Sequence, residues 1–162
     1  MRPIDWKKSR KERRMAKRID PAGYVVKCNE IIKRLTIRAL SELGEQCVTK
    51  IRDRAGDKSW YDQTGNLRSS VGYVIAHNKN IIQYSTFNQV KQGSEGVKTG
   101  KDLAKELAKR YSNNYVLIVV AGMNYAEFVE AMDNKDVLAS TELWAREQVP
   151  LMLEKLKRQI AK

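Results

Sequence analysis

The chain has 162 residues, of which 42% are hydrophobic and 31% charged, and its formal net charge is +12. This length suits one domain with one core, and the composition predicts that most of the chain folds. No stretch approaches the roughly 20 apolar residues that a membrane span needs, and the N-terminus lacks the apolar run of a secretory signal.

Most of the charge lies near the N-terminus. Residues 2–18 contain nine basic and two acidic side chains, a net charge of +7. The basic residues are Arg2, Lys7, Lys8, Arg10, Lys11, Arg13, Arg14, Lys17 and Arg18. Such a segment predicts an anionic partner, either nucleic acid, with Trp6 available to stack, or an acidic protein surface or lipid. We therefore divide the chain into a basic arm, residues 1–19, and a single α+β domain, residues 20–162.

A long helix is predicted directly after the arm. Asp20 suits the N-cap and Pro21 the first helical position. Apolar residues then recur at helical spacing as far as Ile51, with Lys and Arg on the opposite face. Gly56 marks the predicted end, and Gly44 is a point where the helix is expected to weaken or bend.

A β-hairpin is predicted to follow a polar connection. Thr64-Gly65-Asn66 is interpreted as the loop that starts the first strand. Residues 69–77 alternate in the manner of a strand, residues 78–80 form a turn, and residues 81–87 return as the second strand.

The C-terminal half is predicted to alternate between helix and strand. Residues 88–100 form a loop, and Asp102 to Ser112 form a short helix. The apolar run at residues 114–122 predicts a central strand that is covered on both faces. A short helical turn follows at residues 123–132.

The chain then closes with a helix. Residues 136–140 are interpreted as a brief strand, and a last helix runs from Ser140 or Thr141 to Lys162. Pro150 removes a backbone donor, so a kink or a break into two helices is expected there. The predicted fold class is α+β, with the two long helices packed on a small, mainly antiparallel sheet that includes the hairpin.

No catalytic residue, metal site or cofactor is predicted. His77 lies at the hairpin tip, where a solvated turn residue is the favoured interpretation. Ser69 and Ser70 lack the Gly-x-Ser-x-Gly elbow, and the glycines of residues 88–100 do not have the spacing of a phosphate-binding loop. Cys28 and Cys47 would lie roughly 28 Å apart on one helix, too far for a bridge.

One acidic group keeps a metal-dependent nuclease open as an alternative. Glu127 and Glu130 fall at i, i+3 on the short helical turn, and Asp133 and Asp136 follow closely. Carboxylates grouped in this way can hold a metal ion for hydrolysis. We favour the other interpretation, a solvated acidic patch or one that docks on a neighbour's lysines.

Two short motifs resemble a known family. A "TG-x-L-R-x-S" segment opens the hairpin, and a "YA-x-x-VE" segment follows the apolar strand. Their residues here are Thr64, Gly65, Leu67, Arg68 and Ser70, then Tyr125, Ala126, Val129 and Glu130. In this order, within this pattern of elements, the chain resembles the neck or tail-completion proteins of long-tailed bacteriophages. The resemblance covers roughly residues 24–160.

The resemblance implies a structural virion protein rather than an enzyme. It implies a homo-oligomeric ring of six or twelve copies at the head–tail junction, assembled in the host bacterial cytoplasm. The partners would be the portal complex, other connector and portal-adaptor proteins, and tail-tube or terminator proteins, with the arm near genomic DNA in the lumen. The first motif would act as scaffold, and Arg68 is expected to pair with a carboxylate such as Glu130 or to face a neighbour.

Overall fold

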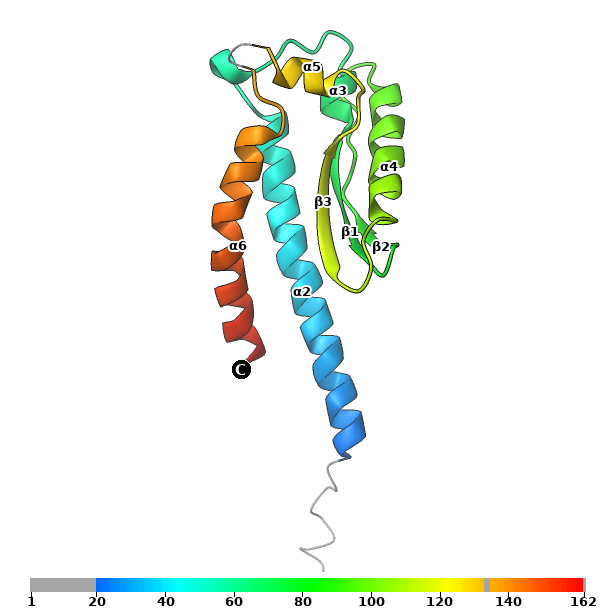
Figure 1. The fold of residues 1–162 in the computed structure, drawn as a ribbon, viewed down its shortest axis with the longest axis vertical. Helices are drawn as coiled ribbons and strands as arrows, with labels where there is room; N and C mark the ends of the chain where they lie inside the picture. Colours follow the sequence, from blue (N-terminus) through cyan, green and yellow to red (C-terminus); the bar gives the residue numbers. More distant parts are fainter. Residues whose placement is uncertain (1–19, 133–134, 162) are drawn as a thin grey trace, which may run out of the picture. The chain divides into compact units, whose positions relative to one another are not determined.

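The computed structural model describes residues 20–132 and 135–161 (Figure 1). The basic arm and Asp133 therefore lie outside the described residues. The described residues as far as Lys33 belong to one compact unit and those from Arg34 onward to a second. The predicted α+β class is confirmed: a long N-terminal helix, a three-stranded antiparallel sheet with a hairpin, and a C-terminal helix.

The first helix, α2, spans Pro21–Arg52. Asp20 caps it as predicted, because its Oδ1 accepts a hydrogen bond from the Ala22 amide at 3.2 Å. The helix ends four residues before the predicted end at Gly56, which instead begins the 3₁₀ turn η1, Gly56–Lys58. Gly44 allows the helix to pack closely against Tyr73, because a Cβ at this position would lie 2.7 Å from the Tyr73 ring.

The sheet has the order β2-β1-β3, with both pairings antiparallel. Its strands are β1, Val71–His77, β2, Asn80–Tyr84, and β3, Tyr115–Ala121. The hairpin is confirmed, but the central position predicted for residues 114–122 is wrong. β1 is the central strand and β3 lies at an edge, because an apolar run indicates coverage of both faces and carries no information about neighbours in the sheet.

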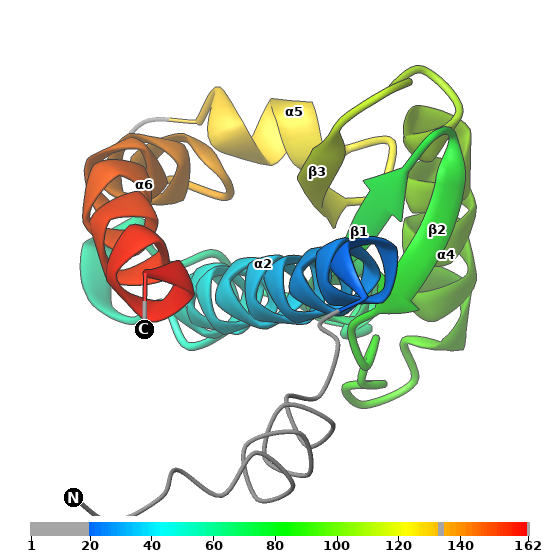
Figure 2. The ribbon, with the colours of Figure 1, turned by 90° about the horizontal axis from the view of Figure 1, so that it is seen from below.

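Two apolar clusters cover the two faces of β1. The sheet lies between helix α4, Ser94–Ala108, and residues 34–52 of α2 (Figure 2). The first contains Val48 and Ile51 of α2 together with Val71, Tyr73 and Ile75 of β1. The second lies under α4 and contains Val74, Ala76, Phe87, Ala104, Ala108, Ile118 and Val120. The alternation predicted for this strand is therefore real, but both of its faces are buried.

Helix α4 begins eight residues before the predicted start at Asp102 and ends at Ala108 rather than Ser112. Gly96 and Gly100, which were interpreted as loop residues, lie on the face of α4 that packs against the segment before β1. A Cβ at Gly96 would collide with the carbonyl oxygen of Asn66, and one at Gly100 with that of Ser70. Small residues here allow the helix backbone to lie against the segment that precedes β1.

The two remaining helices are α5, Ala126–Glu130, and α6, Ala139–Ile160. The predicted strand at residues 136–140 is wrong, since this segment is a bend that leads into α6. A break at Pro150 is also wrong, because α6 is a single helix through that position. α6 runs beside residues 34–52 of α2 in both views, and Lys155 pairs with Glu42 at 3.3 Å (Figures 1 and 2). Among the described helices, none has the length and apolar content to cross a bilayer.

Candidate functional site

The first motif is a tight turn held by Asp62. Its carboxylate accepts hydrogen bonds from the amides of Gly65, at 2.9 Å, and Arg68, at 2.8 Å. Gly65 has a φ of +80°, and the carbonyl oxygen of Val90 lies where its Cβ would be. The predicted loop is therefore followed by a one-turn helix, α3, Asn66–Ser69, before β1 begins.

Arg68 binds its own chain and does not contact Glu130, so the predicted pairing is wrong. Its guanidinium lies over the Trp60 ring, 4.7 Å from the centroid. It also donates to Ser59 Oγ at 3.0 Å and to the carbonyl oxygen of Trp60 at 3.3 Å. The side chain thus fastens the connection after α2 onto α3.

The serines of the first motif are used in the same structural way. Ser69 Oγ accepts a hydrogen bond from the Val90 amide at 2.7 Å, and Ser70 Oγ donates to the carbonyl oxygen of Leu67 at 2.8 Å. Both serines are fully buried. A buried hydroxyl that is bonded to the backbone is not free to act as a nucleophile without breaking these contacts.

The second motif packs against the first. Leu67 belongs to the buried cluster on which Tyr125, Ala126 and Val129 pack. Burial raises the pKa of the Tyr125 hydroxyl, and the carboxylates of Asp62 and Glu95 raise it further. The nearby side chain of Thr64 has the opposite effect on this pKa, so polar groups of the two motifs lie close together.

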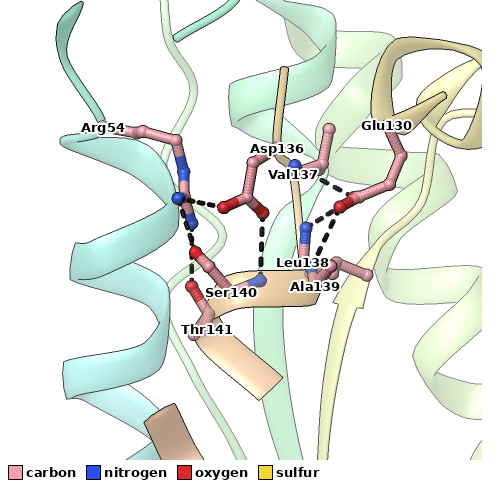
Figure 3. A network of polar contacts seen from close by, with 8 residues as sticks. All are labelled: Arg54, Glu130, Asp136, Val137, Leu138, Ala139, Ser140 and Thr141. Atoms are coloured by element: carbon pink, nitrogen blue, oxygen red, sulfur yellow. Dashed lines mark hydrogen bonds and ion pairs between the residues drawn. The ribbon is translucent and has the colours of Figure 1, made fainter. Parts of the chain in front are cut away.

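Glu130, the last residue of the second motif, caps helix α6 (Figure 3). Its two carboxylate oxygens accept hydrogen bonds from the amides of Val137, Leu138 and Ala139, at 2.9, 2.7 and 3.0 Å. The amides at a helix start have no partner within the helix, and a carboxylate also complements the helix dipole there. Glu130 therefore joins α5 to α6 across residues 131–138.

Asp136 forms the second half of this junction (Figure 3). It pairs with Arg54 at 2.5 Å, and the same guanidinium donates to the hydroxyls of Ser140 and Thr141. Burial by itself raises the pKa of the Asp136 carboxyl, but the hydrogen bonds from Ser140 and the charge of Arg54 outweigh it, so the pKa lies below its ordinary value. Asp136 is buried, so the predicted solvated acidic patch is wrong for this residue.

The acidic group of the nuclease alternative is not brought together in the described part of the chain. Glu127 is exposed, Glu130 binds three backbone amides, and Asp136 binds Arg54. Within the described residues no three His, Cys, Asp or Glu side chains are placed to share a metal ion. Asp133 lies outside those residues.

His77 is half-buried rather than a solvated turn residue. Its ring stacks on Tyr115 with 4.3 Å between the centroids, where β1 and β3 pair. The two cysteines both lie on α2 as free thiols, and burial raises the pKa of Cys47.

An apolar groove was missed in the sequence. It has a volume of about 660 Å³ and is bordered by residues 34–52 of α2, by β3 and by α6. Its apolar lining includes Leu40, Leu43, Leu117, Val119, Val149 and Leu153. Helical periodicity for α2 and α6 and the apolar run of β3 indicated buried residues, but only the arrangement of the three elements shows that a groove is left between them.

Comparisons with known proteins found no match to this chain among family models, curated proteins or solved structures. The resemblance to phage neck proteins therefore remains a prediction that rests on the two motifs.

Proposed function

We propose that this chain is a structural virion protein of a long-tailed bacteriophage, part of the neck or tail-completion ring that joins the capsid portal complex to the tail. The observation that carries the proposal is the junction of the two motifs, in which Tyr125 and Val129 pack on the cluster that contains Leu67. Segments about 60 residues apart that resemble one family belong to the same apolar cluster here, as expected if both are parts of one scaffold.

The chemistry of the junction supports an architectural role. Asp62, Arg68, Ser70 and Glu130 each bind the backbone of this chain. Groups engaged in this way fix the turn, the hairpin and the start of α6. These contacts are sufficient for a structural role, so a non-enzymatic protein is the function that we propose.

The same proposal assigns partners and a location. The protein forms a homo-oligomeric ring at the head–tail junction, between portal-adaptor proteins and tail-tube or terminator proteins. The basic arm, with a net charge of +7 in residues 2–18, faces DNA in the lumen or an adjoining acidic ring.

Immunogold labelling tests this location. Antibodies raised against the purified chain are applied to particles of the phage or prophage that encodes it. Gold at the junction of head and tail is the expected result. Particles that carry no label, with the protein found only free in the lysate, would count against the proposal.

A nucleic-acid-binding protein is the second candidate, and the charge of the arm is the observation that favours it. Electrostatic binding to DNA predicts an affinity that falls steeply with salt and is lost when residues 1–18 are deleted. Fluorescence anisotropy with duplex DNA at several salt concentrations measures both effects. Tight binding without any junction labelling would favour this candidate over the connector.

A further inference from the structure

A second apolar surface lies on the first turns of α2. Five large apolar side chains between Pro21 and Lys33 are exposed, with fractions from 38% at Ile32 to 63% at Tyr24. Four of them share one side of the helix at 3.6 residues per turn, and we name these four the apolar ridge: Tyr24, Val25, Ile31 and Ile32. Exposed apolar residues that gather on one short stretch, rather than singly, mark an interaction surface.

The chain thus carries a convex apolar surface and a concave one. The ridge is a helix of about 10 Å diameter with side chains, and the groove between α2, β3 and α6 is open and lined by Leu117, Val119 and Val149. A helix laid into an apolar groove is a common mode of recognition, and it uses anchors at i, i+3, i+4 and i+7. Tyr24 and Ile31, at i and i+7, are such anchors.

We propose that two copies of this chain associate by placing the apolar ridge of one copy in the apolar groove of the next. This proposal rests on the ring proposed above and identifies its subunit contact. The ridge and the groove are different surfaces, so the contact is heterologous, and repeated contacts of this type close into a ring when the rotation allows it.

The size of the two surfaces suits a stable contact. A helix of 13 residues is about 20 Å long, and laying one side of it in a groove removes on the order of 1,000 Å² from water over both partners, which is the lower limit for a specific interface. In a ring every subunit gives one ridge and receives another, so each copy takes part in two such contacts.

Charge substitutions in the full-length chain test this contact. Ile31→Glu places a carboxylate on the ridge, and Leu153→Glu places one in the groove, where it is desolvated on docking. Both side chains are exposed in the free chain, so circular dichroism is expected to show folded variants. Lys33→Glu on α2 and Leu151→Glu on α6 are matched controls, because Lys33 is exposed on the side of the helix opposite Tyr24 and Leu151 does not line the groove.

Light scattering and analytical ultracentrifugation read out the result. Wild type and both controls are expected to form assemblies larger than a dimer, and each test variant is expected to associate at least tenfold more weakly. An equimolar mixture of the two variants keeps one intact ridge and one intact groove, so it forms a 1:1 heterodimer and nothing larger. A mixture that stays monomeric, variants that assemble like wild type, or a monomeric wild type would each overturn the proposal.

A photo-crosslink locates the contact independently of the variants. Benzoylphenylalanine at Val25 is expected to label α6 or β3 of another copy, as mapped by mass spectrometry. Labels on a different surface, on the same copy or on the basic arm would overturn the contact. A ring that survives Ile31→Glu would refute the ridge and groove but leave the connector role intact, because immunogold labelling does not depend on how subunits touch.

Discussion

Arg68 shows how one side chain can fix a turn. Its guanidinium stacks on Trp60 and donates to Ser59 and Trp60. Arg68→Ala is expected to lower the free energy of unfolding by about 1–3 kcal/mol, since a stacked cation and charge-assisted hydrogen bonds are lost. Arg68→Lys is expected to restore only part of this, because an ammonium lacks the planar fork.

Urea denaturation measures the effect of Arg68, with Arg110→Ala as the control. Arg110 forms an exposed i, i+4 pair with Glu106, whose loss costs about 0.5 kcal/mol or less. Equal and small losses for both variants would contradict the structural role of Arg68.

Glu130 acts at the same scale through three backbone amides. Glu130→Ala leaves these donors without an acceptor in the fold, and we expect a loss of about 1–3 kcal/mol in urea denaturation. Glu127→Ala, on the same short helix but exposed, is expected to change stability by about 0.5 kcal/mol or less. Magnesium-dependent cleavage of DNA that Glu130→Ala abolishes would contradict the capping role and favour the nuclease.

Asp136 predicts how stability depends on pH. Its folded pKa is below the ordinary value of 3.8, so the folded state binds its proton less readily than the unfolded state does. The stability that it contributes is present above about pH 4 and is lost as the pH falls through the lower, folded pKa. The difference in unfolding free energy between wild type and Asp136→Asn is therefore expected to be largest near pH 6 and to shrink on acidification.

Denaturation curves at several pH values measure this difference. Asp102→Asn, which removes an exposed carboxylate paired with Lys105 on the same helix, controls for the loss of a charge. A difference for Asp136→Asn that grows as the pH falls would contradict the sign argued here.

At the scale of elements, α4 depends on its glycines. Gly100 lies against the carbonyl oxygen of Ser70 and the ring of Phe87, and Gly122 approaches the backbone of Gly100. Gly100→Ala is expected to cost about 1–3 kcal/mol despite the better helix propensity of alanine, because the added methyl group must displace backbone atoms. Thermal unfolding followed by circular dichroism measures this.

Lys101→Ala gives the matched comparison, because the neighbouring side chain is exposed and alanine is also the better helix former there. We expect it to leave the melting temperature unchanged or slightly raised. A Gly100→Ala variant that melts at or above the temperature of Lys101→Ala would refute the close packing.

Elements with a strong local pattern could be predicted from the sequence, and those set by distant contacts could not. The 3.6-residue spacing and Asp20 predicted α2, and alternation around residues 78–80 predicted the hairpin. The start of α4 was missed because glycine at Gly96 and Gly100 is typical of loops unless a backbone lies against them. The edge position of β3 was missed because an apolar run does not indicate how many strands pair with it.

The site shows the same limit. The motif residues could be selected from the sequence, but the predicted partner of Arg68 was wrong. No sequence pattern indicates that Ser59 and Trp60 fold back onto this side chain. The role of Glu130 depends on its contact with the amides of residues 137–139, which no periodicity predicts. The groove arises from three elements together, so no single segment carries its signal.

At the scale of the whole molecule, the proposed role is to join heads to tails. The most direct measurement is electron microscopy of a lysate in which the gene for this chain is deleted, with plasmid complementation as the control. If the chain is a connector, the lysate is expected to contain DNA-filled heads and separate tails that join only when the protein is supplied. Normal joined and infectious particles without the protein would refute the connector role.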